Sequence, residues 1–239
     1  MTYDKFADNK NPPILDKSPK SIRTMFNMIA KKYDKLNNIM SFGLHNYIKI
    51  KCVKSLKICP YSNVIDLCTG TGDIARIIKK FTPNADVTGI DFSENMLEIA
   101  VAKSFGEFKD IKYFQGDVTN LPYKDNSFDV VTMGFGLRNI FNAEKAVEEI
   151  YRVLSPGGSF LHVDFNKTSL LSKIYDKITP VLVSPFTENK EAYKYLIKSR
   201  QNFLTPEELI KDFESKGFKL KKRKDYLFGI ISSQIMEKS

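Results

Sequence analysis

Residues 64–73 constrain the fold of this chain more than any other stretch. The stretch opens with a short apolar run that contains Asp66, and it then turns through small residues that include Gly70, Thr71 and Gly72. An apolar pattern with helical spacing follows the turn. We therefore predict a strand, a glycine loop and a helix whose free N–H groups point at the loop. Because glycine has no Cβ, this loop can turn sharply and a ligand can lie against its backbone.

The glycine loop matches two cofactor-binding patterns. Gly70, Gly72 and Ala75 satisfy the dinucleotide pattern G-x-G-x-x-G/A. Asp66, four residues before Gly70, completes the looser pattern acid-x-x-x-Gly-x-Gly of enzymes that bind S-adenosylmethionine (SAM). A tight turn that binds no ligand is the third interpretation, and the loop alone leaves all three open.

Short apolar runs alternate with helical patterns along most of the chain. The predicted strands cover residues 64–67, 85–91, 111–117, 128–133, 159–165, 218–226 and 229–237. Such alternation is typical of an α/β fold with a mostly parallel sheet and helices on both faces. The last two runs predict an antiparallel C-terminal hairpin, which gives a sheet of seven strands.

Helical patterns outside this alternation predict two additions to the sheet. Residues 21–58 form a helical lid, whose middle part, 33–45, is too polar and too broken for a core helix. Residues 166–203 form a helical insertion on the substrate side or, alternatively, a core helix between strands. Residues 1–20 are polar and hold three prolines, so we expect a mobile arm ahead of a single domain over 21–239.

The composition limits the class of protein. With 239 residues and 42% hydrophobic content, the chain can bury one sizeable core. It has no run of about 18 apolar residues and no apolar N-terminal segment, so we expect neither a membrane span nor a secretory signal. Its three cysteines lack the spacing of metal ligands, which favours reduced thiols in a cytoplasmic protein without a metal.

The net charge of +9 comes from lysines spread along the chain, with one dense basic cluster at residues 219–224. A basic surface can bind nucleic acid or an anionic membrane, and it can also be a solvated face without a partner. The sequence carries no signature of a nucleic-acid module, so we expect no nucleic acid and favour the solvated face.

Several polar groups follow predicted strands and should meet at one edge of the sheet. They are the two glycines of the loop, Asp91, Asp117 and the loop after Met133. Asp91 follows Gly72 by 19 residues, which suits a carboxylate that accepts from both ribose hydroxyls of either cofactor.

Three features favour SAM over a nicotinamide cofactor. Asp66 can hold the amino group of a methionine moiety, and Asp117 can accept from an adenine amino group. The residues after the loop complete one sheet instead of building a separate catalytic domain. In the alternative roles, Asp66 binds the backbone of its own loop and Asp117 is a turn residue.

Three motifs carry a resemblance to a known family. They are Tyr33-Asp34-x-Leu36-Asn37-x-x-x-Ser41-x-Gly43-x-His45, Phe135-Gly136-Leu137-Arg138-Asn139 and Arg152-Val153-Leu154-Ser155-Pro156-Gly157-Gly158-x-Phe160-x-x-Val163-Asp164-Phe165-Asn166. With them the chain resembles the ubiquinone/menaquinone biosynthesis C-methyltransferases, from about Ser21 to the terminal hairpin. The departures are Leu36 for the usual Met, Ile48 for Trp, Ser155 for a basic residue, Asp164 for Glu and Asn166 for Ser or Thr.

The resemblance implies a class I SAM-dependent methyltransferase fold, with SAM as methyl donor and no metal. The implied reaction is methyl transfer to a ring carbon of a prenylated quinol. We expect demethylmenaquinol, because the lysine-rich chain without a targeting segment looks bacterial, and a ubiquinol precursor or both quinols as the alternative. By position, Thr71, Asp91, Asp117 and Val118 match the family's cofactor contacts.

Catalytic roles also follow from the resemblance. Arg138 is expected to stabilise the developing phenolate, while Asn139 and Tyr33 position a water that takes the proton. His45 is the second candidate for the base. The alternatives are a surface salt bridge for Arg138, a helix N-cap for Asn139, core packing for Tyr33 and a structural role for His45.

Two other function classes remain at this point: a SAM-binding module without catalysis and an NAD(P)-dependent oxidoreductase. Because the prenyl tail of a quinol dissolves in membranes, the basic hairpin and the lid could dock on anionic lipid at the inner face of the membrane, as the alternative to a solvated face. The resemblance also implies a homodimer.

Overall fold

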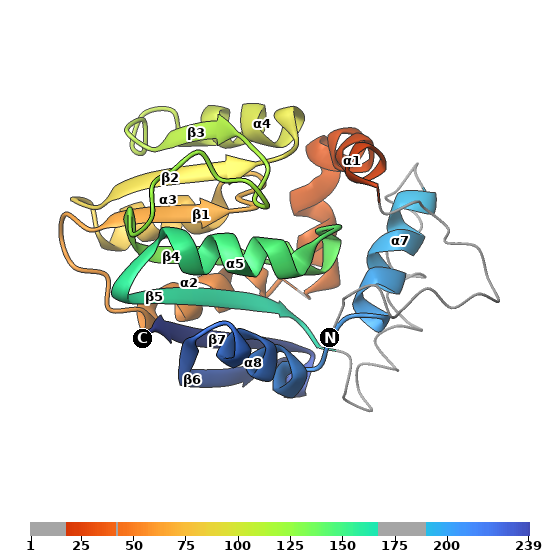
Figure 1. The fold of residues 1–239 in the computed structure, drawn as a ribbon. Helices are drawn as coiled ribbons and strands as arrows, with labels where there is room; N and C mark the ends of the chain where they lie inside the picture. Colours follow the sequence, from red (N-terminus) through yellow and green to blue (C-terminus); the bar gives the residue numbers. More distant parts are fainter. Residues whose placement is uncertain (1–17, 42, 167–189) are drawn as a thin grey trace.

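One sheet of seven strands forms the centre of the computed structural model, which describes residues 18–41, 43–166 and 190–239. The strand order is β3-β2-β1-β4-β5-β7-β6 (Figure 1). The strands are β1 Asn63–Leu67, β2 Asp86–Asp91, β3 Lys112–Gln115, β4 Phe128–Gly134, β5 Leu154–Phe165, β6 Phe218–Tyr226 and β7 Ile231–Lys238. Strands β1 to β5 pair in parallel, whereas β7 pairs antiparallel with β5 and β6. The predicted mixed sheet with a C-terminal hairpin is confirmed.

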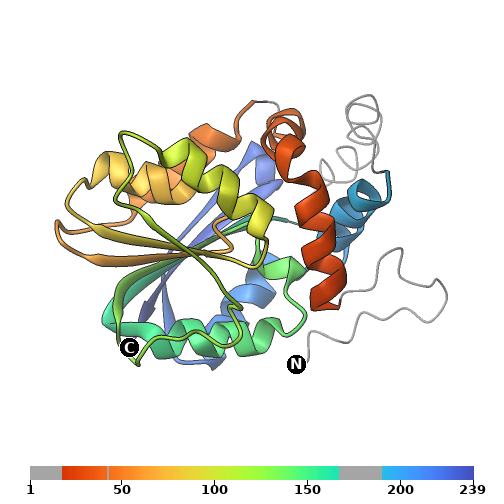
Figure 2. The same cartoon turned by 90° about the horizontal axis from the view of Figure 1, so that it is seen from above.

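Helices cover both faces of this sheet. They are α1 Pro19–Met40, α2 His45–Ser55, α3 Asp73–Phe81, α4 Glu94–Ser104, α5 Ala143–Val153, α7 Lys190–Gln201 and α8 Pro206–Ser215. Seen from above, α2, α3 and α4 lie on one face, α5 and α8 lie on the other, and α1 crosses the end of the sheet (Figure 2). Successive side chains of a strand point to opposite faces of the sheet. Val64 therefore packs with α2 and α3 on one face, while Ile65 packs with α5 on the other.

The glycine loop between β1 and α3 has the predicted form. Gly72 is the N-cap residue of α3 and has a φ of 79°, a conformation that side chains rarely adopt. A Cβ at Gly72 would lie 2.5 Å from the hydroxyl of Tyr113 on β3. Both the turn and the close packing of β3 therefore require glycine at this position.

The prediction of a broken segment at residues 33–45 is wrong in its first part. Helix α1 continues to Met40, because Leu36 and Met40 lie four residues apart and bury their side chains on one face. The polar face of this part of the helix is also bonded, since Asp34 accepts a hydrogen bond from Thr71 and pairs with Lys103. The polar residues of this part of α1 therefore do not break the helix, because they bond to residues of other elements.

Other boundaries differ by a few residues. Ser18 caps α1 and Pro19 is in its first turn, so the end of the predicted arm already belongs to a helix. Strand β5 starts at Leu154, ahead of the expected start, where a register shift lets it pair with Phe128. The hairpin turn falls at Leu227–Gly229, as predicted.

Part of the predicted insertion lies outside the described residues, namely residues 167–189. Its last part is helical as expected, in α7. The division into an arm and one domain stays a prediction. Across the three described ranges, no helix has the length and apolar character needed to cross a membrane.

Candidate active site

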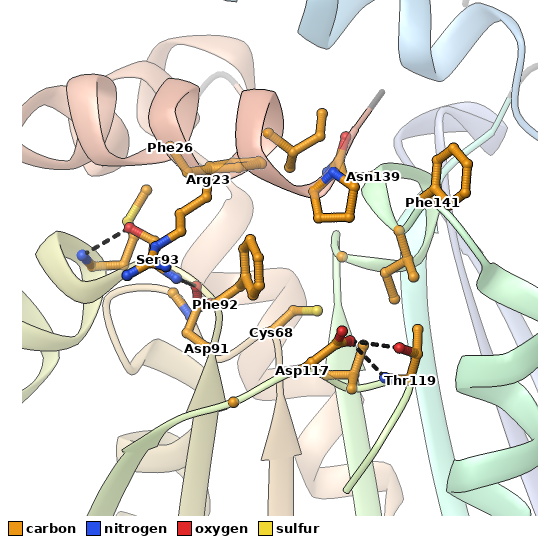
Figure 3. A pocket seen from close by; sticks show the side chains of 18 of the residues that line it. Arg23, Phe26, Cys68, Asp91, Phe92, Ser93, Asp117, Thr119, Asn139 and Phe141 are labelled. Carbon is orange, nitrogen blue, oxygen red and sulfur yellow. Dashed lines mark hydrogen bonds between the residues drawn. The ribbon is translucent and has the colours of Figure 1, made fainter. Parts of the chain in front are cut away.

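A cavity lies at the carboxyl edge of the sheet, below α1. Its polar wall comes from the segments that follow β1, β2, β3 and β4, and its apolar wall comes largely from α1. The predicted residues that line it are Tyr33, Gly70, Asp91, Asp117, Val118 and Asn139. Figure 3 shows Asp91, Asp117 and Asn139 around this cavity. The structure thus brings together the strand ends that the sequence suggested would converge.

Asp91, the last residue of β2, joins the glycine loop to the start of α4. One carboxylate oxygen accepts a 2.7 Å hydrogen bond from the backbone N–H of Gly70, and the other accepts a 2.9 Å bond from Ser93. Burial raises the pKa of Asp91, while these N–H groups lower it in part. Each carboxylate oxygen has a second lone pair, so the group can still accept from hydroxyls in the cavity.

The segment after β3 supplies the next part of the wall. Asp117 is exposed, and one of its oxygens accepts 2.8 Å bonds from the backbone N–H and the hydroxyl of Thr119 (Figure 3). This is the turn arrangement that the sequence left open for Asp117. Both bonds go to one oxygen, so the other can accept from an adenine amino group, and Val118 beside it is buried.

Three predicted cofactor residues do not line the cavity: Asp66, Thr71 and Gly72. The Asp66 carboxylate is buried and accepts 2.6 Å hydrogen bonds from the hydroxyls of Thr69 and Thr132. Burial raises the pKa of Asp66 to about 6 against these bonds. In this position it supports the loop from below, close to the alternative role that the sequence left open.

Thr71 joins the loop to the cover of the cavity. Its hydroxyl donates a 2.8 Å hydrogen bond to Asp34 of α1, which also pairs with Lys103 of α4. Lys103 lies 3.4 Å from the same hydroxyl. Thr71 therefore connects α1 and α4 with the glycine loop.

Arg138 and Asn139 lie in the short helix η2 Leu137–Asn139, after β4. Arg138 is 6% exposed and pairs with Asp164 of β5, so the surface salt bridge considered as the alternative role for Arg138 is wrong, and the ion pair is buried. Asn139 lines the cavity, and its Oδ1 atom has no hydrogen-bond partner among the described residues. The helix N-cap after it is Asn142, so the capping role considered for Asn139 is wrong.

Tyr33 reaches the cavity from α1, and Gly70 lies opposite its ring. Burial raises the pKa of the Tyr33 phenol, and the positive charge of Arg138 partly opposes this effect. His45 does not line the cavity, and its ring lies 3.2 Å from the hydroxyl of Ser41. Burial lowers the pKa of His45. This placement favours the structural role for His45.

Sequence reasoning missed several cavity residues. Phe26 and Arg23 reach it from α1, and Phe92, Cys68 and Phe141 reach it from segments beyond strand ends (Figure 3). Cys68 and Phe92 each follow directly after a strand. Only polar groups at this position were predicted to belong to the site, so these two residues were missed. The residues of α1 had only a helical spacing, which is equally typical of core packing.

Comparisons with known proteins identify the family. A model of the ubiE/COQ5 methyltransferase family matches residues 15–238. A demethylmenaquinone methyltransferase of Staphylococcus aureus (strain JH9) is 38% identical over 219 residues, which are 89% of this chain and 88% of that relative. This chain belongs to the ubiE/COQ5 methyltransferase family, as its motifs predicted.

Solved structures agree on the fold. A SAM-dependent methyltransferase of Thermotoga maritima gives a TM-score of 0.68 at 22% identity, over 91% of this chain and 100% of its own. The phosphoethanolamine N-methyltransferase 2 of Haemonchus contortus, solved with SAM, gives 0.57 at 21% identity, over 75% of this chain and 38% of its own. The protein is a SAM-dependent methyltransferase with the class I fold.

Asp66 yields a prediction for stability against pH. Its pKa is about 6 in the folded protein, above the roughly 3.9 of an unfolded chain, so the folded state binds this proton more tightly. The contribution of Asp66 to the free energy of unfolding therefore falls as pH rises from about 4 to about 7, by roughly 3 kcal/mol at about 1.4 kcal/mol per pKa unit.

Asp66→Asn keeps the shape and removes the ionisation. We expect the free energy of unfolding of this variant, measured in urea, to lose the Asp66 part of the pH dependence and to exceed that of the parent at about pH 7. Curves that stay parallel for the two proteins between about pH 4 and about pH 7 would refute this assignment.

Asp91 yields a prediction for SAM affinity. Asp91→Ala removes the acceptor for ribose hydroxyls and releases the Gly70 N–H, so the dissociation constant for SAM should rise at least about tenfold. Calorimetric titration measures it. Asp86→Ala, at the other end of β2 and on the surface, is the matched control and should bind SAM as the parent does. Equal affinity of both variants would remove Asp91 from the binding site.

Proposed function

We propose that this protein transfers the methyl group of SAM to a ring carbon of a prenylated quinol, with demethylmenaquinol as the substrate. The observation that carries the proposal is one cavity with two kinds of wall. Its polar side holds Gly70, Asp91 and Asp117, and the side next to Arg138 holds Asn139 and apolar residues of α1. The identity to the S. aureus demethylmenaquinone methyltransferase supports the naphthoquinol.

The polar side fits SAM residue by residue. Gly70 gives this side of the cavity a wall without a side chain. The nearest atom to a Cβ at Gly70 would be a ring carbon of Tyr33, at 3.9 Å. Asp91 would accept from the ribose hydroxyls, and Asp117 with Val118 would hold the adenine. SAM supplies a methyl group that is already activated by the sulfonium charge. Asp66, Thr71 and Gly72 would act on the cofactor only through the shape of the loop.

The other side fits a quinol ring. The new C–CH₃ bond forms as the S–CH₃ bond breaks, the electron pair stays on sulfur, and the quinol releases one proton. The side-chain amide of Asn139 would hold a water or the quinol hydroxyl, and Tyr33 also lines the cavity. Arg138 would stabilise the phenolate through its charge. Positioning of this kind contributes up to roughly 7–11 kcal/mol.

The test is methyl transfer from labelled SAM to two reduced substrates in parallel, a short-tailed demethylmenaquinol and a demethylated ubiquinol precursor. We expect label in the menaquinol product. Label only in the ubiquinol product would mean that the substrate is a benzoquinol and not a naphthoquinol. Label in both products would mean one enzyme for two pathways. SAM bound without label in either product would refute both quinols as substrates.

We also propose that the protein works at the inner face of a membrane, since its substrate carries a prenyl tail. One surface combines aromatic rings with lysines, and we name it the aromatic–lysine face: the exposed Tyr47, Lys51, Lys54, Phe81, Lys224 and Phe228, and the half-buried Tyr226. Lys51 lies 5.3 Å from the ring centre of Tyr47, and Lys54 lies 4.3 Å from that of Phe81. Rings and lysines side by side suit the headgroup region of an anionic bilayer.

Three segments distant in sequence form this face: α2, the end of α3 at Phe81, and the C-terminal hairpin. Helix α2 meets the hairpin where the Cys52 thiol lies 3.6 Å from the Tyr226 hydroxyl. Beyond Tyr226, Leu227, Phe228 and Gly229 all have positive φ, and Phe228 is 86% exposed. The lysines of β6 have a second explanation, because β6 is an edge strand and lysines protect such edges from pairing with other chains.

Vesicle sedimentation tests the membrane contact at the lysines of α2. Lys51→Glu/Lys54→Glu should weaken binding to phosphatidylcholine–phosphatidylglycerol vesicles at least about tenfold, because each lysine contributes about 1 kcal/mol near an anionic surface. Lys109→Glu/Lys124→Glu, on loops before β3 and β4, makes the same charge change and should bind as the parent does. Parent protein that stays in the supernatant at low salt would refute the membrane contact. A homodimer stays a prediction.

A further inference from the structure

We propose that Asp164 is a positioning residue of this enzyme, which holds the guanidinium of Arg138 in place behind the quinol end of the cavity. This inference rests on the proposed function, because Arg138 has a role there only if a phenolate develops. No motif argument gave Asp164 a role, and it does not line the cavity.

The first observation is the fixed geometry of the pair. Asp164 is 1% exposed, and one of its oxygens accepts from Arg138 and also, at 2.7 Å, from the backbone N–H of Phe165. The same arginine nitrogen donates a 2.9 Å bond to the carbonyl of Phe135. The guanidinium lies 5.5 Å from the ring centre of Phe165. Carboxylate, carbonyl and ring thus restrain Arg138 from three sides.

The second observation is the cost of this arrangement. A buried ion pair loses hydration on both partners and is often no more stabilising than apolar residues of the same size. Here the second oxygen of Asp164 and the Nε of Arg138 have no hydrogen-bond partner among the described residues. Buried polar atoms left without partners are rare in folded proteins and call for a reason other than stability.

The third observation is the position of the pair next to the cavity. Arg138 precedes Asn139, whose side chain lines it, and both residues bond to the carbonyl of Phe135. The charge of Arg138 reaches Tyr33 of α1 and Tyr195 of α7, where it lowers the pKa of each phenol against the larger effect of burial. A charge held at this point acts on whatever occupies the quinol end.

The chemistry explains why position matters. The phenolate is stabilised when Arg138 donates from a place already set, without reorganisation at the moment of reaction. Misplacement by about 1 Å can cost roughly 10²-fold in rate. Asp164 would supply this placement without touching the substrate or SAM.

The test measures kcat for methyl transfer, the KM for the quinol, SAM affinity and thermal stability of the same variants. Asp164→Asn should lower kcat at least about tenfold and leave the dissociation constant for SAM within about twofold of the parent. Asp164→Glu restores the charge and should recover most of kcat. The matched control is Glu149→Gln, which alters a carboxylate–arginine pair in α5 outside the cavity, with a buried carboxylate and a partly exposed arginine, and should keep the parental kcat.

A double-variant cycle tests whether Asp164 acts through Arg138. Arg138→Gln/Asp164→Asn leaves no unpaired charge. It should turn over as Arg138→Gln alone does, because Asp164 has no effect on kcat once the arginine that it positions is absent. This comparison also serves if Asp164→Asn alone does not fold. A further tenfold loss in the double variant would overturn the inference, as would an Asp164→Asn variant with the kcat of Glu149→Gln.

The proposed function and this inference fail differently. Parent protein that binds SAM but methylates neither quinol ends the proposed function. Parent protein that methylates demethylmenaquinol, together with variants of Asp164 that lose SAM affinity and kcat in proportion, ends the inference alone and leaves a purely structural ion pair.

Discussion

The carboxylate of Asp91 is the contact on which the rest of the site depends. Its two bonds, to Gly70 and to Ser93, hold the glycine loop, the end of β2 and the start of α4 at one point. Ser93 also caps α4 through Met96 and donates a 2.5 Å hydrogen bond to Asn27 of α1. One acidic side chain therefore links the floor of the cavity to its cover, and a ligand that bonds to Asp91 acts on all of these elements.

Helix α1, which covers the cavity, is attached by polar pairs and by an apolar stripe. Along α1, Arg23 pairs with Glu94, Asn27 with Ser93, and Asp34 with Thr71 and Lys103. Partly exposed ion pairs contribute only about 0–1 kcal/mol each. The apolar stripe of α1 packs mainly on Met96 and α7, and the sheet core contacts only its C-terminal end. Burial of this stripe, which includes Met25 and Ile29, therefore contributes more to the attachment of α1 than its partly exposed polar pairs do.

The layers of the fold were predictable because each strand carries its own signal. Apolar runs, turn residues and the caps at Ser93 and Thr205 are local, and the structure has these elements within a few residues of the expected places. The continuity of α1 was not predictable in the same way. Asp34 and Asn37 look like breakers of a core helix until Thr71 and Lys103 are known to face Asp34, and that pairing spans more than 30 residues of chain.

The acids near the strand ends of the candidate site were also only partly predictable from the sequence. Asp91 is the last residue of β2 and lines the cavity, whereas Asp66 and Asp164 are each the second-to-last residue of their strands and are buried. A residue within a strand points to a face of the sheet, where neighbouring elements cover it. Asp66 therefore meets Thr69 and Thr132, and Asp164 meets Arg138.

A shift of one position thus changes an acid that lines the cavity into one that is buried behind it. Motif spacing counts residues from the glycines, but the boundary of a strand depends on which neighbour it pairs with, and that is a property of the sheet. For this reason the sequence could place Asp66 directly ahead of the glycine loop and still predict a direct contact with the cofactor, although Asp66 does not line the cavity. The supporting acids act through groups that they hold, so their effect should appear in the placement of a loop or a charge.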